Sequence, residues 1–230
     1  MRKWEDLPKE LQLEEVRPYY DILAQKRVSL FLKRVFDIVV SLLLLLVLSP
    51  AFLILAIAIK VDSKGPVFYR QTRITQYKKE FKIHKFRSMC DGADKEGTTV
   101  TIHNDRRVTK VGKLIRKCRL DEISQLIDVL QGNMSFVGTR PEVPKYVAEY
   151  SPEMMATLLL PAGITSEASI RYKDEDRLLD GADDVDRVYV EEVLPAKMKW
   201  NLESIKKFLL FRDVLTMIRT MFAIMGKNYK

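Results

Sequence analysis

Two adjacent acids, Asp121 and Glu122, directly follow a segment in which every charged side chain is basic. A carboxylate beside guanidinium groups stays ionised, so it can serve as a nucleophile or as a magnesium ligand. The cations themselves suit phosphate oxygens. This arrangement indicates chemistry on a phosphorylated substrate. The basic segment, residues 106–119, carries Arg106, Arg107, Lys110, Lys113, Arg116, Lys117 and Arg119.

A structural explanation of the acid pair is also open, because acids at the start of a helix complement its dipole. Apolar residues at helical spacing from Leu120 to Leu130 predict a helix that ends near Gly132. A loop at residues 135–141 follows and holds Arg140 next to a proline, where its planar guanidinium can bind phosphate. A positioned carboxylate, a cation and a phosphate-binding loop together favour phosphoryl transfer.

These groups follow a run of 22 uncharged residues, Ile38 to Ile59, which indicates a membrane protein. As one straight helix the run would be about 33 Å long, enough to cross a bilayer. Ser49-Pro50 interrupts it, and a proline inside a helix predicts a kink. Equal numbers of basic residues on the two sides favour a re-entrant helix that returns to the cytoplasmic leaflet. A kinked helix that spans the membrane is the alternative.

The composition of the chain indicates which classes of partner to expect. A net charge of +8 and a pI near 9.3 indicate binding to phospholipid, nucleotide or another anion. Segment 106–119 lacks the interleaved aromatic residues that stack on bases, so nucleic acid is not expected. Cys90 and Cys118 lack metal-ligand spacing, which fits a reducing cytosol, and His84 and His103 stand apart from other ligands.

The remaining pattern predicts an α+β fold that is mostly helical and membrane-associated, with interfacial amphipathic helices and a short antiparallel sheet. The expected parts are a membrane-proximal segment at 1–30, a re-entrant helix at 31–62 and a cytosolic catalytic domain at 63–230. Within the catalytic domain we expect strands at 67–73 and 81–89, followed by a mobile loop at 90–105. Further along we expect a broken helical region at 144–160, a turn at 163–165 and a charged segment at 171–186. An amphipathic helix is expected within 197–225, and it is either interfacial or part of the core.

Several short motifs occur in an order typical of one family. The sequence resembles the bacterial monotopic phosphoglycosyl transferases, also called the bacterial sugar transferase family, from Lys33 to about Met217. The matching motifs are Lys33-Arg34-Val35-Phe36-Asp37, Ser49-Pro50, Gly65-Pro66-Val67-Phe68-Tyr69-Arg70-Gln71-Thr72-Arg73, Lys85-Phe86-Arg87-Ser88-Met89, Leu120-Asp121-Glu122 and Gly132-Asn133-Met134-Ser135-Phe136-Val137-Gly138-Thr139-Arg140-Pro141.

The resemblance implies transfer of a sugar 1-phosphate from a UDP-sugar to polyprenyl (undecaprenyl) phosphate, with release of UMP, at the first membrane step of surface-glycan assembly. It implies that Asp121 attacks the β-phosphate and forms a covalent phosphosugar intermediate. Glu122 would handle a proton or organise Mg²⁺, with Asp121 as a metal ligand. The expected location is the cytosolic face of a bacterial inner membrane. The resemblance also assigns substrate and phosphate binding to Lys85, Arg87, Arg116, Arg140 and Asp186.

The chain departs from the family pattern at three places. Residues 75–78 lack the glycines usual there, and Thr139 replaces a frequent proline. Segment 160–167 lacks the usual arginine and tryptophan, for which Arg171 and Lys173 are candidate substitutes. These differences do not touch the acid pair, so they bear on the sugar rather than on the reaction. The competing hypothesis is a non-catalytic membrane-anchored basic protein that binds anionic lipid or nucleic acid.

Overall fold

A computed structural model describes residues 1–93, 106–173 and 184–226, so most of the predicted loop at 90–105 and of the charged segment at 171–186 lies outside the described residues. The α-helices are α1 (Arg17–Ala24), α2 (Arg27–Asp62), α3 (Lys110–Lys117), α4 (Leu126–Gln131), α5 (Pro144–Val147), α6 (Glu167–Arg171), α8 (Val185–Val188), α9 (Leu194–Lys206) and α10 (Leu210–Ile224). The strands are β1 (Phe68–Ile74), β2 (Glu80–Phe86), β3 (Met134–Val137) and β4 (Ala162–Thr165). Short 3₁₀ helices include η1 (Trp4–Asp6), η2 (Lys9–Leu11), η3 (Gln76–Lys78), η5 (Leu120–Gln125) and η6 (Met154–Leu159). The mostly helical α+β fold is confirmed.

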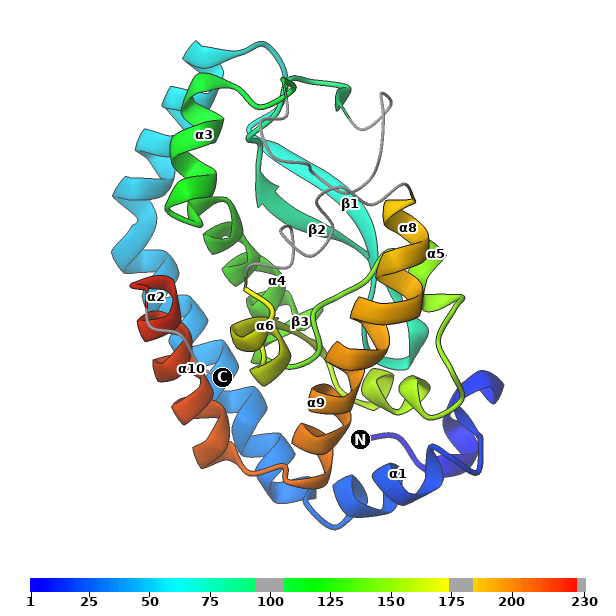
Figure 1. Cartoon of the computed structure of the whole chain (residues 1–230). Helices are drawn as coiled ribbons and strands as arrows, with labels where there is room; N and C mark the ends of the chain where they lie inside the picture. The colour runs from blue at the N-terminus through cyan, green and yellow to red at the C-terminus, as the bar shows by residue number, and fades with distance from the viewer. Residues whose placement is uncertain (94–105, 174–183, 227–230) are drawn as a thin grey trace.

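Helix α2 carries the apolar run and is 36 residues long, or about 54 Å. It begins at Arg27 rather than at residue 31 and continues through Pro50. Among the described residues it is the one helix long and apolar enough to cross a membrane. Figure 1 shows α2 running along one side of the molecule, from α1 to the turn that precedes β1. The Ser49-Pro50 pair therefore does not divide α2 into two separate helices.

One side of α2 packs against the rest of the chain along both of its halves. Lys33 and Asp37, four residues apart, are buried, and they bond to the backbone oxygen of Val137 and the backbone N–H of Phe136. Past Pro50, Phe52 packs against a cluster that contains Phe86 and Ile115. The other side of α2 exposes a long apolar surface that includes Phe31, Val39, Leu43, Leu46, Val47, Leu53, Ile54 and Ile57.

Two small sheets position the loops of the molecule. Strands β1 and β2 form the predicted antiparallel pair, with Arg70 opposite His84. Strands β3 and β4 pair in parallel, with Met134 opposite Ala162. The predicted turn at 163–165 is therefore wrong, and the predicted loop at 135–141 starts as a strand. Gly138 and Gly163 make this pairing close, because a Cβ on Gly163 would lie 2.1 Å from the nitrogen of Gly138.

The connection between β1 and β2 explains why glycine is usual there. Tyr77 and Lys78 both adopt left-handed backbone conformations, each with a φ of 59°. Such conformations strain residues that carry a Cβ and favour glycine. Tyr77 is held by the N-terminal segment, since its hydroxyl accepts a bond from the Arg2 N–H at 3.1 Å.

The C-terminal region forms two helices with different environments, not one. Phe208 is buried between them, and Leu209 is extended, which ends the helical path. Helix α9 buries Met198, Leu202 and Ile205 and is a core helix. Helix α10 instead presents apolar side chains outward, including Phe211, Leu215, Ile218, Met221 and Phe222.

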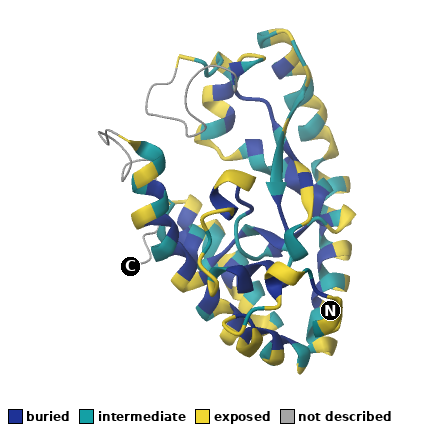
Figure 2. Cartoon of the chain, turned by 90° about the vertical axis from the view of Figure 1, so that its right-hand side faces the viewer, coloured by how far each residue is buried: buried dark blue, intermediate teal, exposed yellow. Residues whose placement is uncertain are grey.

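The N-terminal segment packs against the main core. Leu11, Val16 and Leu23 are fully buried in a cluster with Leu159 and Phe208. Figure 2 shows buried residues where elements meet and exposed residues along the outer sides of the helices. Residues 1–26 therefore stabilise the fold through their own apolar contacts.

Candidate active site

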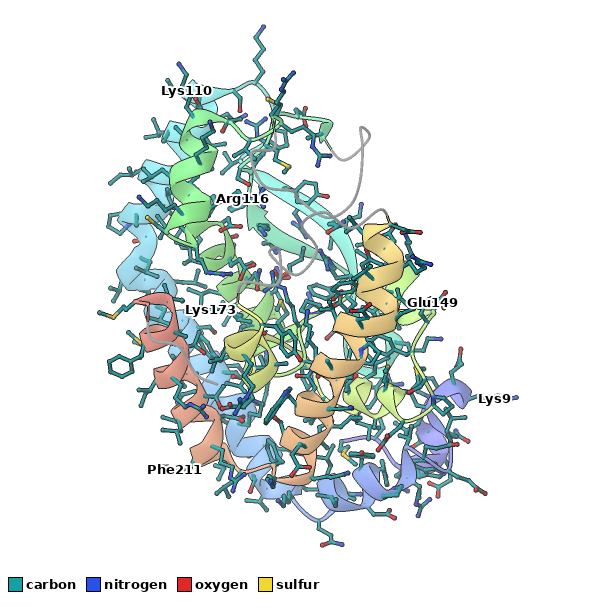
Figure 3. The ribbon with its side chains drawn as sticks, viewed as in Figure 1. Lys9, Lys110, Arg116, Glu149, Lys173 and Phe211 are labelled. Atoms are coloured by element: carbon teal, nitrogen blue, oxygen red, sulfur yellow. The ribbon has the colours of Figure 1, made fainter. Side chains whose placement is uncertain are left out.

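A cavity of about 550 Å³ opens between the β1–β2 hairpin, α3 and residues 140–146. Its lining is strongly cationic: eight basic side chains face it, against the two acids Asp91 and Glu142. Figure 3 shows Arg116 on α3 beside the hairpin. Focused positive charge in a cleft attracts and holds anions. The basic residues are Arg70, Arg73, Lys85, Arg87, Arg107, Arg116, Arg140 and Lys197.

The acid pair lies directly behind two of these cations. Lys85 Nζ is 2.9 Å from Asp121 Oδ2 and 3.6 Å from Glu122 Oε1. Arg140 donates to both carboxylate oxygens of Glu122, at 3.3 and 2.5 Å. Asp121 is only 5% exposed, and neither acid lines the cavity. A phosphate that drew Lys85 and Arg140 toward itself would therefore uncover the two carboxylates.

The local backbone explains how the pair is held. Arg119 adopts a left-handed conformation with a φ of 52° and redirects the chain at the end of α3. The acids then lie in η5, a 3₁₀ helix, where an α-helix was expected from Leu120 onward. A strained residue beside a site is typical of functional positions. The predicted α-helix is confirmed only over α4, which ends at Gln131.

The ion pairs change the acidity of Glu122. Burial opposes its charge, but the cations of Arg140 and Lys85 outweigh burial and hold the pKa of Glu122 well below its usual value. Glu122 is thus a carboxylate throughout the physiological range. A charged Glu122 suits the organisation of cations better than the donation of a proton.

The other predicted binding residues have different surroundings. Arg116 and Arg140 both line the cavity. Arg87 lines it too, but its terminal nitrogens contact the backbone oxygens of Ser63 and Lys64, just after the end of α2. In this arrangement Arg87, which directly follows β2, links the end of α2 to the strand that carries Lys85.

Asp186 lies outside the cavity lining. It pairs with Lys145 and accepts a bond from the hydroxyl of Tyr146 at 2.5 Å. Both bonds hold the pKa of Asp186 below its usual value. Tyr146 does line the cavity, so the hydrogen bond from its hydroxyl connects Asp186 to the site. The candidate substitutes Arg171 and Lys173 are also absent from the lining, and Arg171 stacks on Trp200.

Three residues that line the cavity, Glu142, Tyr189 and Lys197, were not predicted from the sequence. Glu142 is buried and accepts a bond from the Tyr189 hydroxyl at 2.6 Å. Lys197 lies 3.2 Å from the same hydroxyl and 3.9 Å from Glu142. Glu142 and Tyr189 are 47 positions apart, so no local pattern could have joined them. The one available signal was the proximity of Glu142 to Arg140 in the sequence.

The acid pair supplies part of the coordination that a magnesium ion needs. No group of three or more acidic, histidine or cysteine side chains that could hold a metal occurs among the described residues. Asp121 and Glu122 offer two adjacent carboxylates. Mg²⁺ is commonly held by one or two carboxylates together with substrate phosphates and water. The acid pair therefore fits an ion that arrives with a diphosphate.

Comparison with known proteins places the chain among its relatives. A UDP-N-acetylgalactosamine-undecaprenyl-phosphate N-acetylgalactosaminephosphotransferase of Aeromonas hydrophila is 34% identical over 198 residues, which cover 85% of this chain and 44% of that protein. A UDP-glucose:undecaprenyl-phosphate glucose-1-phosphate transferase of Escherichia coli (strain K12) is 35% identical over 211 residues, or 90% and 43% of the two chains.

A third relative is closer in length. A UDP-glucose:undecaprenyl-phosphate glucose-1-phosphate transferase of Caulobacter vibrioides is 34% identical over 191 residues, or 82% of this chain and 67% of that protein. The chain thus spans less than half the length of the first two relatives and two thirds of this one. The bacterial sugar transferase family model matches residues 28–227. The chain belongs to the bacterial sugar transferase family.

Proposed function

We propose that this protein transfers a sugar 1-phosphate from a UDP-sugar to polyprenyl phosphate and releases UMP. The observation that carries the proposal is the acid pair behind a cationic cavity, with Lys85 and Arg140 between the carboxylates and the cavity space. The names of the relatives support both substrates, since each names a UDP-sugar and undecaprenyl phosphate. Those names differ in the sugar, so the sugar remains for experiment.

In the first step the donor's diphosphate enters the cavity and exchanges places with the carboxylates as the partner of Lys85 and Arg140. Asp121 then attacks the β-phosphorus, and the bond from that phosphorus to the bridging oxygen breaks. UMP leaves with the bridging oxygen, and the sugar phosphate remains on Asp121 as an acyl phosphate. Cations aligned along the cavity stabilise the charge that develops on the leaving UMP.

In the second step an oxygen of polyprenyl phosphate attacks the same phosphorus. The acyl phosphate bond breaks, Asp121 regains its carboxylate, and a polyprenyl-diphosphate sugar forms. Neither step requires a proton from the enzyme, which agrees with a Glu122 that stays ionised. Asp121 and Glu122 would hold Mg²⁺ together with the substrate phosphates, and the ion would supply neutralisation of phosphate charge.

We further propose that α2 is re-entrant and that the domain lies on the cytosolic face of a bacterial inner membrane. Both halves of α2 contact the same domain, while their opposite side is apolar and exposed. Helix α10 adds a second outward apolar surface, as an interfacial helix in contact with phospholipid would. A lipid phosphate and a soluble nucleotide sugar can meet at such a surface.

The test is UMP release by purified protein from a panel of UDP-sugars, with Mg²⁺ and undecaprenyl phosphate present. One sugar that supports release, together with a lipid-linked product, would establish the reaction. A protein that binds anionic vesicles but consumes no donor in the panel would support the non-catalytic alternative instead. An Arg140→Lys variant should release UMP more slowly than wild type, because an ammonium cannot reproduce the two parallel hydrogen bonds of a guanidinium.

A further inference from the structure

Among the described residues no third strand pairs with the outer edge of β2, and side chains bond to its backbone instead. Its sheet contains β1 and β2, and His84 lies on the edge of β2 opposite η5 and α4. The backbone N–H of His84 donates to Asp128 Oδ2 at 2.8 Å. Its backbone oxygen accepts a bond from the Ser124 hydroxyl at 3.0 Å. Both polar backbone groups at this point of the edge are thus satisfied.

Asp128 makes a second bond to the same residue. Its Oδ1 lies 2.8 Å from His84 Nδ1, and its side chain is fully buried. The other ring nitrogen, Nε2, lies 2.6 Å from a guanidinium nitrogen of Arg70. Arginine can only donate, so Nε2 must accept and the ring proton must be on Nδ1. The imidazole is therefore neutral and connects the cation of Arg70 to the buried carboxylate of Asp128.

This connection explains how a charge can be buried at Asp128. An ionised carboxylate in an apolar interior is costly unless it is paired and hydrogen-bonded. Asp128 receives two hydrogen bonds from His84, and Arg70 supplies the compensating charge through the ring. Arg70 itself lines the cationic cavity.

Two short connections link Arg70, His84 and Asp128 to the acid pair. Lys85 follows His84 in β2 and contacts both Asp121 and Glu122. Ser124 lies three residues after Asp121 in η5, and its hydroxyl is 3.3 Å from the backbone oxygen of Asp121. One hydroxyl thus touches the backbone of the strand that carries Lys85 and that of the helix that carries the nucleophile.

We propose that Arg70, His84 and Asp128 are positioning residues that fix Lys85 against Asp121. The inference rests on the proposed role of Asp121 as the nucleophile. Catalytic groups must be held to within about 0.5 Å, and a displacement near 1 Å can cost about 100-fold in rate. The hydrogen bonds to both the backbone and the ring of His84 supply that precision.

The first experiment is a substitution tested in two backgrounds. Asp128→Asn replaces one acceptor oxygen with an amide donor, so one of the two bonds to His84 is lost. The rate of UMP release in the absence of lipid acceptor should fall about 10- to 100-fold, with less than about 3-fold change in the donor concentration for half-maximal rate. In a Lys85→Met background the same substitution should change the rate less than about 2-fold, because the group it positions is absent.

A purely structural role predicts a different pattern. In that case Asp128→Asn would lower the rate by the same factor in both backgrounds, and that result would overturn the proposal. Leu158→Ala is the matched control for lost stability, since Leu158 is buried in the main core with Leu11 and Leu159, a cluster that does not contain the three proposed positioning residues. Ser124→Ala is a milder second variant that removes one bond to the edge and should lower the rate in the same background-dependent way.

A second measurement does not depend on turnover. Acylation of Lys85 by a water-soluble amine reagent, followed by mass spectrometry, reports whether its ammonium is held against the acids. Reactivity should rise several-fold in Asp128→Asn and stay unchanged in Leu158→Ala. Unchanged reactivity in Asp128→Asn would refute the positioning role. If wild-type protein released no UMP while Lys85 reactivity still rose, the proposed function would fail and the positioning would stand.

Discussion

Lys85 Nζ contacts both Asp121, at 2.9 Å, and Glu122, at 3.6 Å, so one ammonium bridges the two adjacent carboxylates. Adjacent acids repel each other, and a shared cation removes that cost. The same ammonium lines the cavity, where an incoming phosphate would compete for it. In the proposed mechanism, arrival of the donor would therefore release Asp121, the proposed nucleophile.

Replacement of Asp121, the proposed nucleophile, tests the chemistry directly. Asp121→Asn should lower UMP release about 10³-fold or more, because an amide cannot form the acyl phosphate. Intact-protein mass spectrometry of wild type with donor alone should show the added sugar phosphate, and the variant should show none. Normal activity in Asp121→Asn would rule out this mechanism. Asp6→Asn, in η1, is a control substitution of the same type.

The depressed pKa of Glu122 predicts how stability depends on pH. The unfolded chain takes up a proton on this carboxyl near pH 4.5, whereas the folded chain does not. The stabilisation by Glu122 is therefore fully present above that pH and is lost as the pH falls toward the folded pKa. Glu122→Gln should be less stable than wild type at pH 7 by about 1–2 kcal/mol, and the difference should narrow below pH 4.

Thermal denaturation in detergent between pH 7 and pH 3 measures this difference. Glu14→Gln, an exposed acid near the N-terminus, is the control and should leave the curve unchanged. If the difference in stability between Glu122→Gln and wild type widened in acid, the predicted direction of the pH dependence would be wrong.

The two cysteines allow the cavity to be probed without a reaction. Cys90 is exposed and lines the cavity, whereas Cys118 is exposed at the end of α3 and outside the lining. A bound UDP-sugar should slow maleimide labelling of Cys90 about tenfold at ten times its Kd, and labelling of Cys118 should not change. Cys118→Ser and Cys90→Ser variants separate the two signals. Equal protection of both thiols would argue against donor binding in this cavity.

The left-handed backbone of Lys78 predicts a stabilising substitution. A left-handed conformation costs a residue with a Cβ roughly 1–2 kcal/mol, and glycine avoids that cost at an entropic penalty of roughly 0.5–1 kcal/mol. Lys78→Gly should therefore raise the stability by about 0.5–1 kcal/mol in chemical denaturation. Lys79→Gly is the matched control, since Lys79 has a φ of −66° and should lose stability on the same change.

The re-entrant proposal for α2 predicts that both of its flanks lie on one side of the membrane. Single cysteines at Glu14 and Lys64, in a chain lacking Cys90 and Cys118, report those flanks, and both positions are exposed. In intact cells a membrane-impermeant maleimide should label neither position, and both should be labelled after lysis. Labelling of one flank alone in intact cells would establish a spanning helix.

The sequence alone determined the features that depend on neighbours along the chain. The acid pair after a basic segment, the long apolar run, the β1–β2 hairpin and the broken helical region at 144–160, which forms α5 and η6, are all local patterns. Residue type and spacing decide such features before any long-range contact forms. The family resemblance, carried by short motifs in order, belongs to the same category.

Only the tertiary structure decided the features that depend on contacts between distant segments. Residues 163–165 look like a turn by composition, but parallel pairing with β3 makes them part of strand β4. His84 looked isolated, yet Asp128, 44 positions away, binds both its backbone and its ring. The outward apolar face of α10 and the bonds of Arg87 to the end of α2 likewise follow from packing. Burial and hydrogen-bond partners are properties of the assembled chain, so residue spacing cannot specify them.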